Sequence, residues 1–117
     1  MTALPHHHDR KTEAVFDHMP APEAFQATAE WMKLLSDVSR LRLFWTLCHC
    51  EECVLNLAAM MDMSSPALSH HLKLLRTSGL IVSRREGKEV YYKAANTPQA
   101  AALHVMIEQI ADLTCPG

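Results

Sequence analysis

Apolar residues recur at helical spacing through most of the chain, in runs separated by polar residues that favour turns or helix starts. Successive runs predict four helices, over residues 24–36, 38–48, 54–61 and 66–77. Residues 50–53 are expected to form a turn between the second and third of these. The fourth helix has clear boundaries, because Ser65 is a typical N-cap residue, Pro66 suits the first helical position and Gly79 suits a C-terminal stop.

The hydrophobic period changes after the fourth helix. Residues 80–83 and 89–94 form β-type runs, and the polar residues 84–88 join them. We therefore predict a β-hairpin with a basic tip. Pro98 then opens a last helix that ends near Leu113. Its apolar positions form one stripe, which a lone small domain would leave exposed: Leu103, Met106, Ile107, Ile110 and Leu113.

The chain divides into a tail and a domain. Residues 1–20 are polar, rich in histidine and bounded by prolines, so we interpret them as a mobile N-terminal arm. Residues 21–117 then form one domain, mainly α with a small β-hairpin, an α+β class with about five helices.

Composition narrows the class of protein. The chain has 117 residues, of which 49% are hydrophobic and 21% charged, which is ordinary for a globular domain and too apolar for a disordered one. No apolar run approaches the ~20 residues that a membrane span needs, and the N-terminus has no apolar stretch of the secretory type. We expect a cytoplasmic protein that does not enter a membrane.

Charge is segregated along the chain. The formal net charge is −2, but residues 66–93 carry +4, which leaves −6 on the remainder. One basic segment on an acidic body is the pattern expected of a surface that binds a polyanion.

The order of the predicted elements indicates a DNA-binding fold. A short helix, a tight turn, a second helix and a basic hairpin are typical of a winged helix-turn-helix. Small and polar residues at the start of the second helix suit a major groove about 12 Å wide, and basic residues on the hairpin suit the DNA backbone or minor groove. We expect DNA contacts from Ser64, Ser65, Ala67, Ser69, His70, Lys73 and Arg76 on the helix, and from Arg84, Arg85 and Lys88 on the hairpin.

The run Ser64-Ser-Pro-Ala-Leu-Ser-His-His-Leu-Lys-Leu-Leu-Arg-Thr-Ser-Gly-Leu-Ile, followed by Gly87-Lys-Glu-Val-Tyr-Tyr, resembles the ArsR/SmtB family of small bacterial metal-responsive repressors. The resemblance covers roughly residues 31–113. It implies that Ser69-His70-His71-Leu72 belongs to the recognition helix. It also implies a homodimer built on the first and last helices of the domain, here residues 24–36 and 98–113.

The cysteines suggest a site for a soft ligand. Clustered thiols in a cytosolic chain indicate a metal or redox site before a structural disulfide, and a Cys-x-x-Cys that spans one turn offers two sulfurs to a tetrahedral metal. The expected ligands are Cys48, Cys50 and Cys53, with further candidates in His6, His7, His8, His49 and Cys115. His104 and Glu108 lie four residues apart on the last helix, and we interpret them as a surface pair.

The family comparison locates the expected metal. The last six residues of the family pattern Glu-Leu-Cys-Val-Cys-Asp-Leu fall here on Glu52-Cys53-Val54-Leu55-Asn56-Leu57, so Leu55 replaces the second cysteine. The family's other site, on the last helix, falls on Asn96, Pro98 and Gln109, none of which is a good ligand. Any metal is therefore expected near the start of the helix over residues 54–61.

Three functional hypotheses follow. The first is a homodimeric repressor that leaves operator DNA when a thiophilic ion, such as zinc, cadmium or lead, binds its cysteines. The second is a redox- or persulfide-sensing repressor of the same fold, using Cys50 with Cys53 or Cys48 with Cys115. The third, a zinc-dependent enzyme, is disfavoured because the chain has no His-Glu-x-x-His motif and no base paired with a nucleophile.

Overall fold

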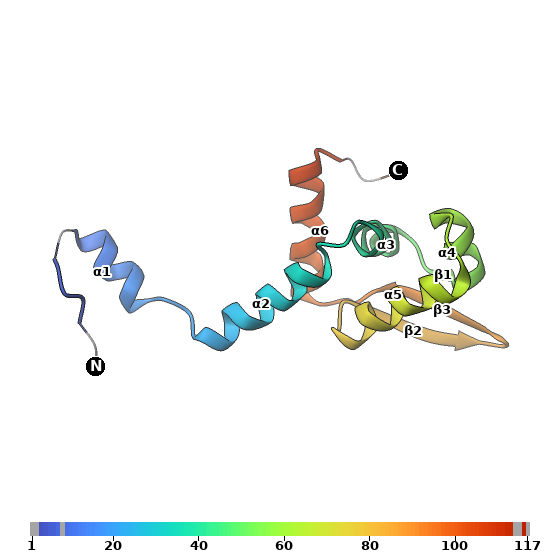
Figure 1. Cartoon of the computed structure of the whole chain (residues 1–117), viewed down its shortest axis with the longest axis horizontal. Helices are drawn as coiled ribbons and strands as arrows, with labels where there is room; N and C mark the ends of the chain where they lie inside the picture. The colour runs from blue at the N-terminus through green and yellow to red at the C-terminus, as the bar shows by residue number, and fades with distance from the viewer. Residues whose placement is uncertain (1–2, 8, 114–115, 117) are drawn as a thin grey trace. The chain divides into compact units, whose positions relative to one another are not determined.

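The computed structural model describes residues 3–7, 9–113 and 116 (Figure 1). Two of the predicted metal ligands, His8 and Cys115, lie outside the described residues. The chain forms two compact units, Met1–Glu30 and Trp31–Gly117, and the division falls within one helix.

The first unit contains a helix where the sequence predicted only a mobile arm. Helix α1 spans Arg10–Asp17, and the Asp9 carboxylate caps it by accepting a hydrogen bond from the Lys11 backbone N–H at 2.8 Å. Helix α2, Pro22–Leu34, begins in this unit. The capping aspartate and Glu13 in the first turn stabilise α1 locally, although the helix buries none of its residues. The division at residues 20 and 21 into an arm and a domain stays a prediction.

The second unit has the predicted architecture. Its elements after α2 are α3 Val38–His49, β1 Glu52–Cys53, α4 Val54–Met61, α5 Ser65–Thr77, β2 Ile81–Glu86, β3 Glu89–Ala94 and α6 Pro98–Ala111. The fold class, mainly α with a β-hairpin wing, is confirmed. The described residues contain six helices, against about five expected, because α1 was not foreseen.

Short polar residues set the helix boundaries. The Asp37 carboxylate accepts from the Arg40 backbone N–H at 3.0 Å and starts α3. The Ser64 hydroxyl accepts from the Ala67 N–H at 3.3 Å and starts α5, so the predicted cap at Ser65 was wrong by one residue. Gly79 ends α5 with a φ of +82°, as expected, because glycine adopts the left-handed region without strain.

The sheet has a third strand that the sequence did not reveal. The strands are antiparallel in the order β1-β3-β2, and Glu52 and Cys53 pair with Tyr92 and Tyr91 of β3. The prediction of a turn at residues 50–53 was therefore wrong. The backbone at Cys50 and Cys53 is extended, because the outer edge of β3 offers hydrogen-bonding partners that no local pattern announces.

The hairpin is longer than predicted and its turn is shorter. Arg84 and Arg85 lie within β2, paired with Tyr91 and Val90, and were wrongly placed at the tip. The turn consists of Gly87 and Lys88, and Gly87 has a φ of +63°. A two-residue turn with a left-handed glycine matches the twist of antiparallel strands, so polar residues that resembled a loop continue the strands.

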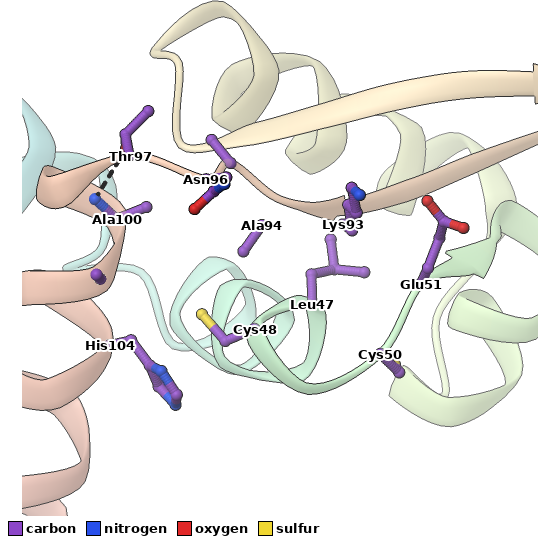
Figure 2. Close-up of a pocket in the computed structure, with 12 residues that line it drawn as sticks. Leu47, Cys48, Cys50, Glu51, Lys93, Ala94, Asn96, Thr97, Ala100 and His104 are labelled. Atoms are coloured by element: carbon purple, nitrogen blue, oxygen red, sulfur yellow. Dashed lines mark hydrogen bonds between the residues drawn. The ribbon is translucent and has the colours of Figure 1, made fainter.

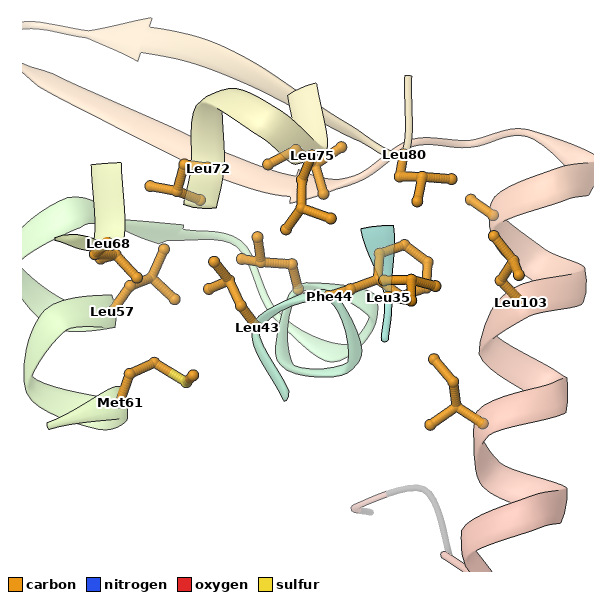
Figure 3. Close-up of a cluster of buried hydrophobic side chains, with 14 of the residues drawn as sticks. Leu35, Leu43, Phe44, Leu57, Met61, Leu68, Leu72, Leu75, Leu80 and Leu103 are labelled. Atoms are coloured by element: carbon orange, nitrogen blue, oxygen red, sulfur yellow. The ribbon is translucent and has the colours of Figure 1, made fainter. Parts of the chain in front are cut away.

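The core of the second unit surrounds helix α3 (Figure 3). Leu43 and Phe44 of α3 have no exposed surface, and Leu47 is 2% exposed. Residues from α4, α5, β2 and α6 close around them: Leu57, Met61, Leu68, Leu72, Leu75, Ile81, Leu103 and Ile107. Helix α3 therefore supports every element that the DNA-binding hypothesis uses.

Truncating the centre of this core should destabilise the whole unit. We expect Phe44→Ala to lower the free energy of unfolding by about 3–5 kcal/mol, because it removes a fully buried ring and leaves a cavity. Val38→Ala on the same helix is the control, since Val38 is 71% exposed, and should change stability by less than about 0.5 kcal/mol. Urea unfolding followed by circular dichroism measures both, and similar losses would contradict a core centred on α3.

Candidate functional site

Helix α5 separates a buried face from an exposed polar face. Leu68, Leu72 and Leu75 are at most 1% exposed and fix the helix against α3 and α4. This spacing turns the remaining positions outward. The exposed residues are Ser64, Ala67, Ser69, His70, Lys73 and Arg76, and Ser65 is half-buried. The structure therefore brings the predicted helix residues together on one surface, with small side chains first and basic ones one and two turns later.

The neighbouring His71 holds α5 in place and does not join that surface. Its Nδ1 lies 3.3 Å from Arg40 Nη1, and the Arg40 Nε donates to the Leu34 carbonyl at 2.8 Å. Burial lowers the pKa of His71, while Asp37 acts against this shift. A neutral His71 accepts the Arg40 hydrogen bond, which links α5 to the start of α3.

Arg84 of the wing is held by acidic side chains. Its Nε and Nη2 donate to Glu51 Oε1 at 2.9 and 2.7 Å, and its Nη1 donates to Glu86 Oε2 at 2.7 Å. Its guanidinium carbon also lies 4.9 Å from the centre of the Tyr91 ring. These hydrogen bonds raise the pKa of Arg84 and lower that of Glu51. Arg84 therefore fastens the wing to the segment before β1, and part of its charge is neutralised.

The other basic residues of the wing project into solvent. Arg85 and Lys88 are exposed, and in the part of the chain that the structure describes neither forms a salt bridge. Lys73 and Arg76 on α5 are also exposed, and among the described residues neither forms a salt bridge. Positive charge that is available to phosphates thus comes from α5 and from the end of the wing.

The cysteines do not form one ligand cluster. Cys48 and Cys50 are half-buried, and Cys53 is 9% exposed. Among the described residues, these three do not make a group whose ligand atoms lie within 4.8 Å of one another. Figure 2 shows Cys48 and Cys50 apart from each other along one pocket, which His104 of α6 also lines. The cysteine site stays a prediction.

Local chemistry also favours the neutral form of the Cys50 thiol. Burial, followed by the charge of Glu52, raises its pKa, and its Sγ lies 3.4 Å from the Thr46 carbonyl, to which it donates. A metal ligand must be a thiolate, so an ion at Cys50 has to displace this proton.

In the first unit, His7 pairs with the Glu13 carboxylate, and the role of the histidine arm stays a prediction.

A different group of metal-binding side chains comes together between α3 and α6. His49 at the end of α3 meets His104 and Glu108 of α6, and their side chains are only 16%, 21% and 14% exposed. The interpretation of His104 and Glu108 as a surface pair was therefore wrong. The four-residue spacing on α6 was visible in the sequence, but the approach of His49 depends on how α3 and α6 cross.

Similarity to known proteins decides the family. The model for "Bacterial regulatory protein, arsR family" matches residues 37–83, which contain the helix-turn-helix. The arsenical resistance operon repressor of Escherichia coli K12 is 36% identical over 86 residues, covering 73% of this chain and 74% of the relative. The chain belongs to the ArsR family. It is a regulatory protein and not an enzyme.

Two other comparisons add detail. A transcriptional repressor SmtB homolog from Synechocystis is 43% identical over 89 residues, covering 74% of this chain and 63% of the relative. The homodimeric winged helix-turn-helix DNA-binding domain Mb0332 of Mycobacterium bovis superposes with a TM-score of 0.66 at 28% identity, covering 93% of this chain and 91% of that one. None of the described helices of this ArsR-family chain is long and apolar enough to cross a membrane.

The hydrogen bonds between Arg84 and Glu51 predict how the Glu51 carboxylate titrates in acid. The pKa of Glu51 should lie below that of an ordinary glutamate, and Arg84→Gln should raise it because two hydrogen bonds are lost. The contribution of this bridge to the stability of the fold is fully present above the ordinary glutamate pKa, and it is lost as the pH falls through the lowered pKa of Glu51. Carbon-detected NMR titration of the carboxylates measures this shift. Arg85→Gln is the matched control, and an equal shift there would contradict the bridge.

Proposed function

We propose that this ArsR-family chain is a transcriptional repressor that binds operator DNA as a homodimer in the cytoplasm. The exposed polar face of α5, beside a basic wing, carries the proposal. Its small N-terminal residues permit close approach to base edges, while Lys73 and Arg76 lie where phosphates flank the groove. Arg85 and Lys88 extend the contact along the DNA, and Arg84 mainly holds the wing.

Exposed apolar surface on α6, and at Leu113 just after it, supports the homodimer. Val105, Ile110 and Leu113 are 51%, 78% and 45% exposed, which is costly for a monomer in water. We place the dimer contact on α6 and on α2, the first helix of the predicted domain. The homodimeric state of Mb0332 supports this assembly. Two-fold symmetry then sets the two α5 helices about one DNA turn apart, on an inverted-repeat operator.

A thiophilic ion, such as zinc, cadmium or lead, is the proposed effector at the cysteines. A relative that carries arsenical resistance in its name supports an effector of this chemical kind. For Cys50 and Cys53 to share an ion, with Cys48 as a third ligand, the extended segment between them must bend. Bending disrupts the pairing of β1 with β3. An ion bound by the cysteines would therefore change how the wing is attached to the rest of the domain.

Removing one phosphate contact from each protomer should weaken DNA binding without changing its sequence preference. We expect Lys73→Ala to reduce the slope of log affinity against log salt by about 2 for the homodimer, since each of the two lost contacts releases about one counterion. Lys73→Arg, which keeps the charge, is the control and should keep the slope. Fluorescence anisotropy on the operator at several salt concentrations measures this. An unchanged slope in Lys73→Ala would remove α5 from the proposed interface.

The cysteine site makes a separate prediction. Cys50→Ser with Cys53→Ser should preserve operator binding and abolish release by Cd²⁺, because hydroxyls do not replace thiolates for soft ions. A titration of the operator complex with Cd²⁺, in the presence of a reductant, measures release and excludes thiol oxidation. Unchanged release from the double variant would show that these cysteines are not the effector site.

A further inference from the structure

We propose that His49, His104 and Glu108 form a second effector site, which binds a borderline divalent ion of the zinc type within one protomer. The site is separate from the cysteines and from Asn96, Pro98 and Gln109 of the last-helix pattern. Its link to operator binding rests on the proposed function, but binding of the ion itself does not.

The distances between the three side chains suit a single ion. His49 Nε2 lies 3.0 Å from His104 Nε2 and 3.5 Å from Glu108 Oε2, and His104 Nε2 lies 3.1 Å from Glu108 Oε1. Two ligands about 2.0–2.1 Å from a tetrahedral zinc ion are roughly 3.3 Å apart. The three groups are already close to the separations that such an ion requires.

The donor set selects the class of ion. Two imidazole nitrogens and one carboxylate oxygen suit zinc, cobalt and nickel better than they suit calcium or magnesium, which favour oxygen ligands. Three protein ligands leave a fourth position for water. The three side chains are 14–21% exposed, so the cluster is shielded while a path to solvent remains.

Neighbouring groups hold the ligands in position. The Trp45 indole N–H donates to Glu108 Oε2 at 3.3 Å, and the Trp45 ring lies 4.6 Å from the His49 ring, measured between centroids. An outer donor of this kind orients a ligating carboxylate. Trp45 and His49 lie one turn apart on α3, and His104 and Glu108 lie one turn apart on α6, so rigid helices position every part of the site.

An ion at this site would join α3 to α6. Without an ion, hydrogen bonds link the three side chains, and a proton on one histidine Nε2 must move before both nitrogens can ligate. Helix α3 supports α5 through the core, and α6 belongs to the proposed dimer contact. Fixing α3 against α6 therefore couples the setting of the DNA-reading helix to the dimer interface.

Cobalt titration of the purified full chain tests the site directly. In the Cys50→Ser, Cys53→Ser background, which lacks the proposed thiolate site, Co²⁺ should give the visible absorption of a tetrahedral ion without the intense near-ultraviolet band of a thiolate ligand, and Zn²⁺ should displace it. Glu108→Gln and His104→Gln should each weaken binding by more than about 100-fold, and Trp45→Phe by about 10-fold. Thermal unfolding confirms that each variant is folded, and Glu108→Gln keeps the shape and the acceptor for Trp45.

Matched controls separate this site from the other candidate ligands. In the same Cys50→Ser, Cys53→Ser background, His18→Gln and replacement of His6, His7 and His8 by glutamine should each leave the cobalt spectrum and affinity unchanged. Loss of the spectrum in any of these controls, or its persistence in folded Glu108→Gln, would overturn the proposal.

Operator anisotropy with Zn²⁺ then tests the regulatory link. In the Cys50→Ser, Cys53→Ser variant, which lacks the proposed thiolate site, Zn²⁺ should still weaken operator binding by roughly 5–150-fold, the range of ordinary allosteric coupling, and adding Glu108→Gln should remove that effect. Zinc binding without any change in operator affinity would contradict the link. Failure of the ion-free wild type to bind an operator would contradict the proposed repressor function, whereas the cobalt titration would still decide the metal site.

Discussion

The burial of helix α3 is the constraint on which the rest of the structure depends. Leu43, Phe44 and Leu47 are the centre of the only extensive apolar cluster that the described residues form, and helices α4, α5 and α6 with the start of β2 pack around them. Burying these side chains removes apolar surface from water and fixes the angle at which each neighbour lies. The surface that faces DNA in our proposal is the outer side of this packing.

The same constraint explains how a nearly neutral chain presents a basic surface. Helix α5 buries its leucines at a regular spacing, so its serine, histidine and basic residues are turned outward together. The Arg40–His71 contact and the Arg84–Glu51 bridge then fix the helix and the wing to the acidic body. Glu51 thus holds the wing through Arg84, Arg40 holds α5 through His71, and Lys73, Arg76, Arg85 and Lys88 remain available to a polyanion.

Local signals in the sequence were sufficient for most of the fold. The bounds of α4 were predicted without error, and those of α3, α5 and α6 to within two residues, because apolar period, N-caps and Gly79 all act within a few positions. Strand β1 was missed because its hydrogen bonds go to a strand almost forty residues later. The length of the wing was missed because exposed strand residues are as polar as a loop.

The candidate sites show the same division between local and distant information. The outward face of α5 could be predicted, since it follows from one helix and its buried leucines. The Cys-x-x-Cys spacing suggested a turn, whereas pairing of β1 with β3 keeps that segment extended. His49 lies on a different helix from His104 and Glu108, so their meeting depends on the crossing of α3 and α6, which no spacing along the chain records.

The central claim is that two copies of α5 read successive major grooves of an inverted repeat. Methylation interference at guanine N7 on the selected operator, combined with hydroxyl-radical footprinting, tests it most directly. We predict interference in two half-sites about one helical turn apart, with protected backbone flanking each on one face of the duplex. Interference in a single half-site, or protection without any major-groove interference, would contradict it.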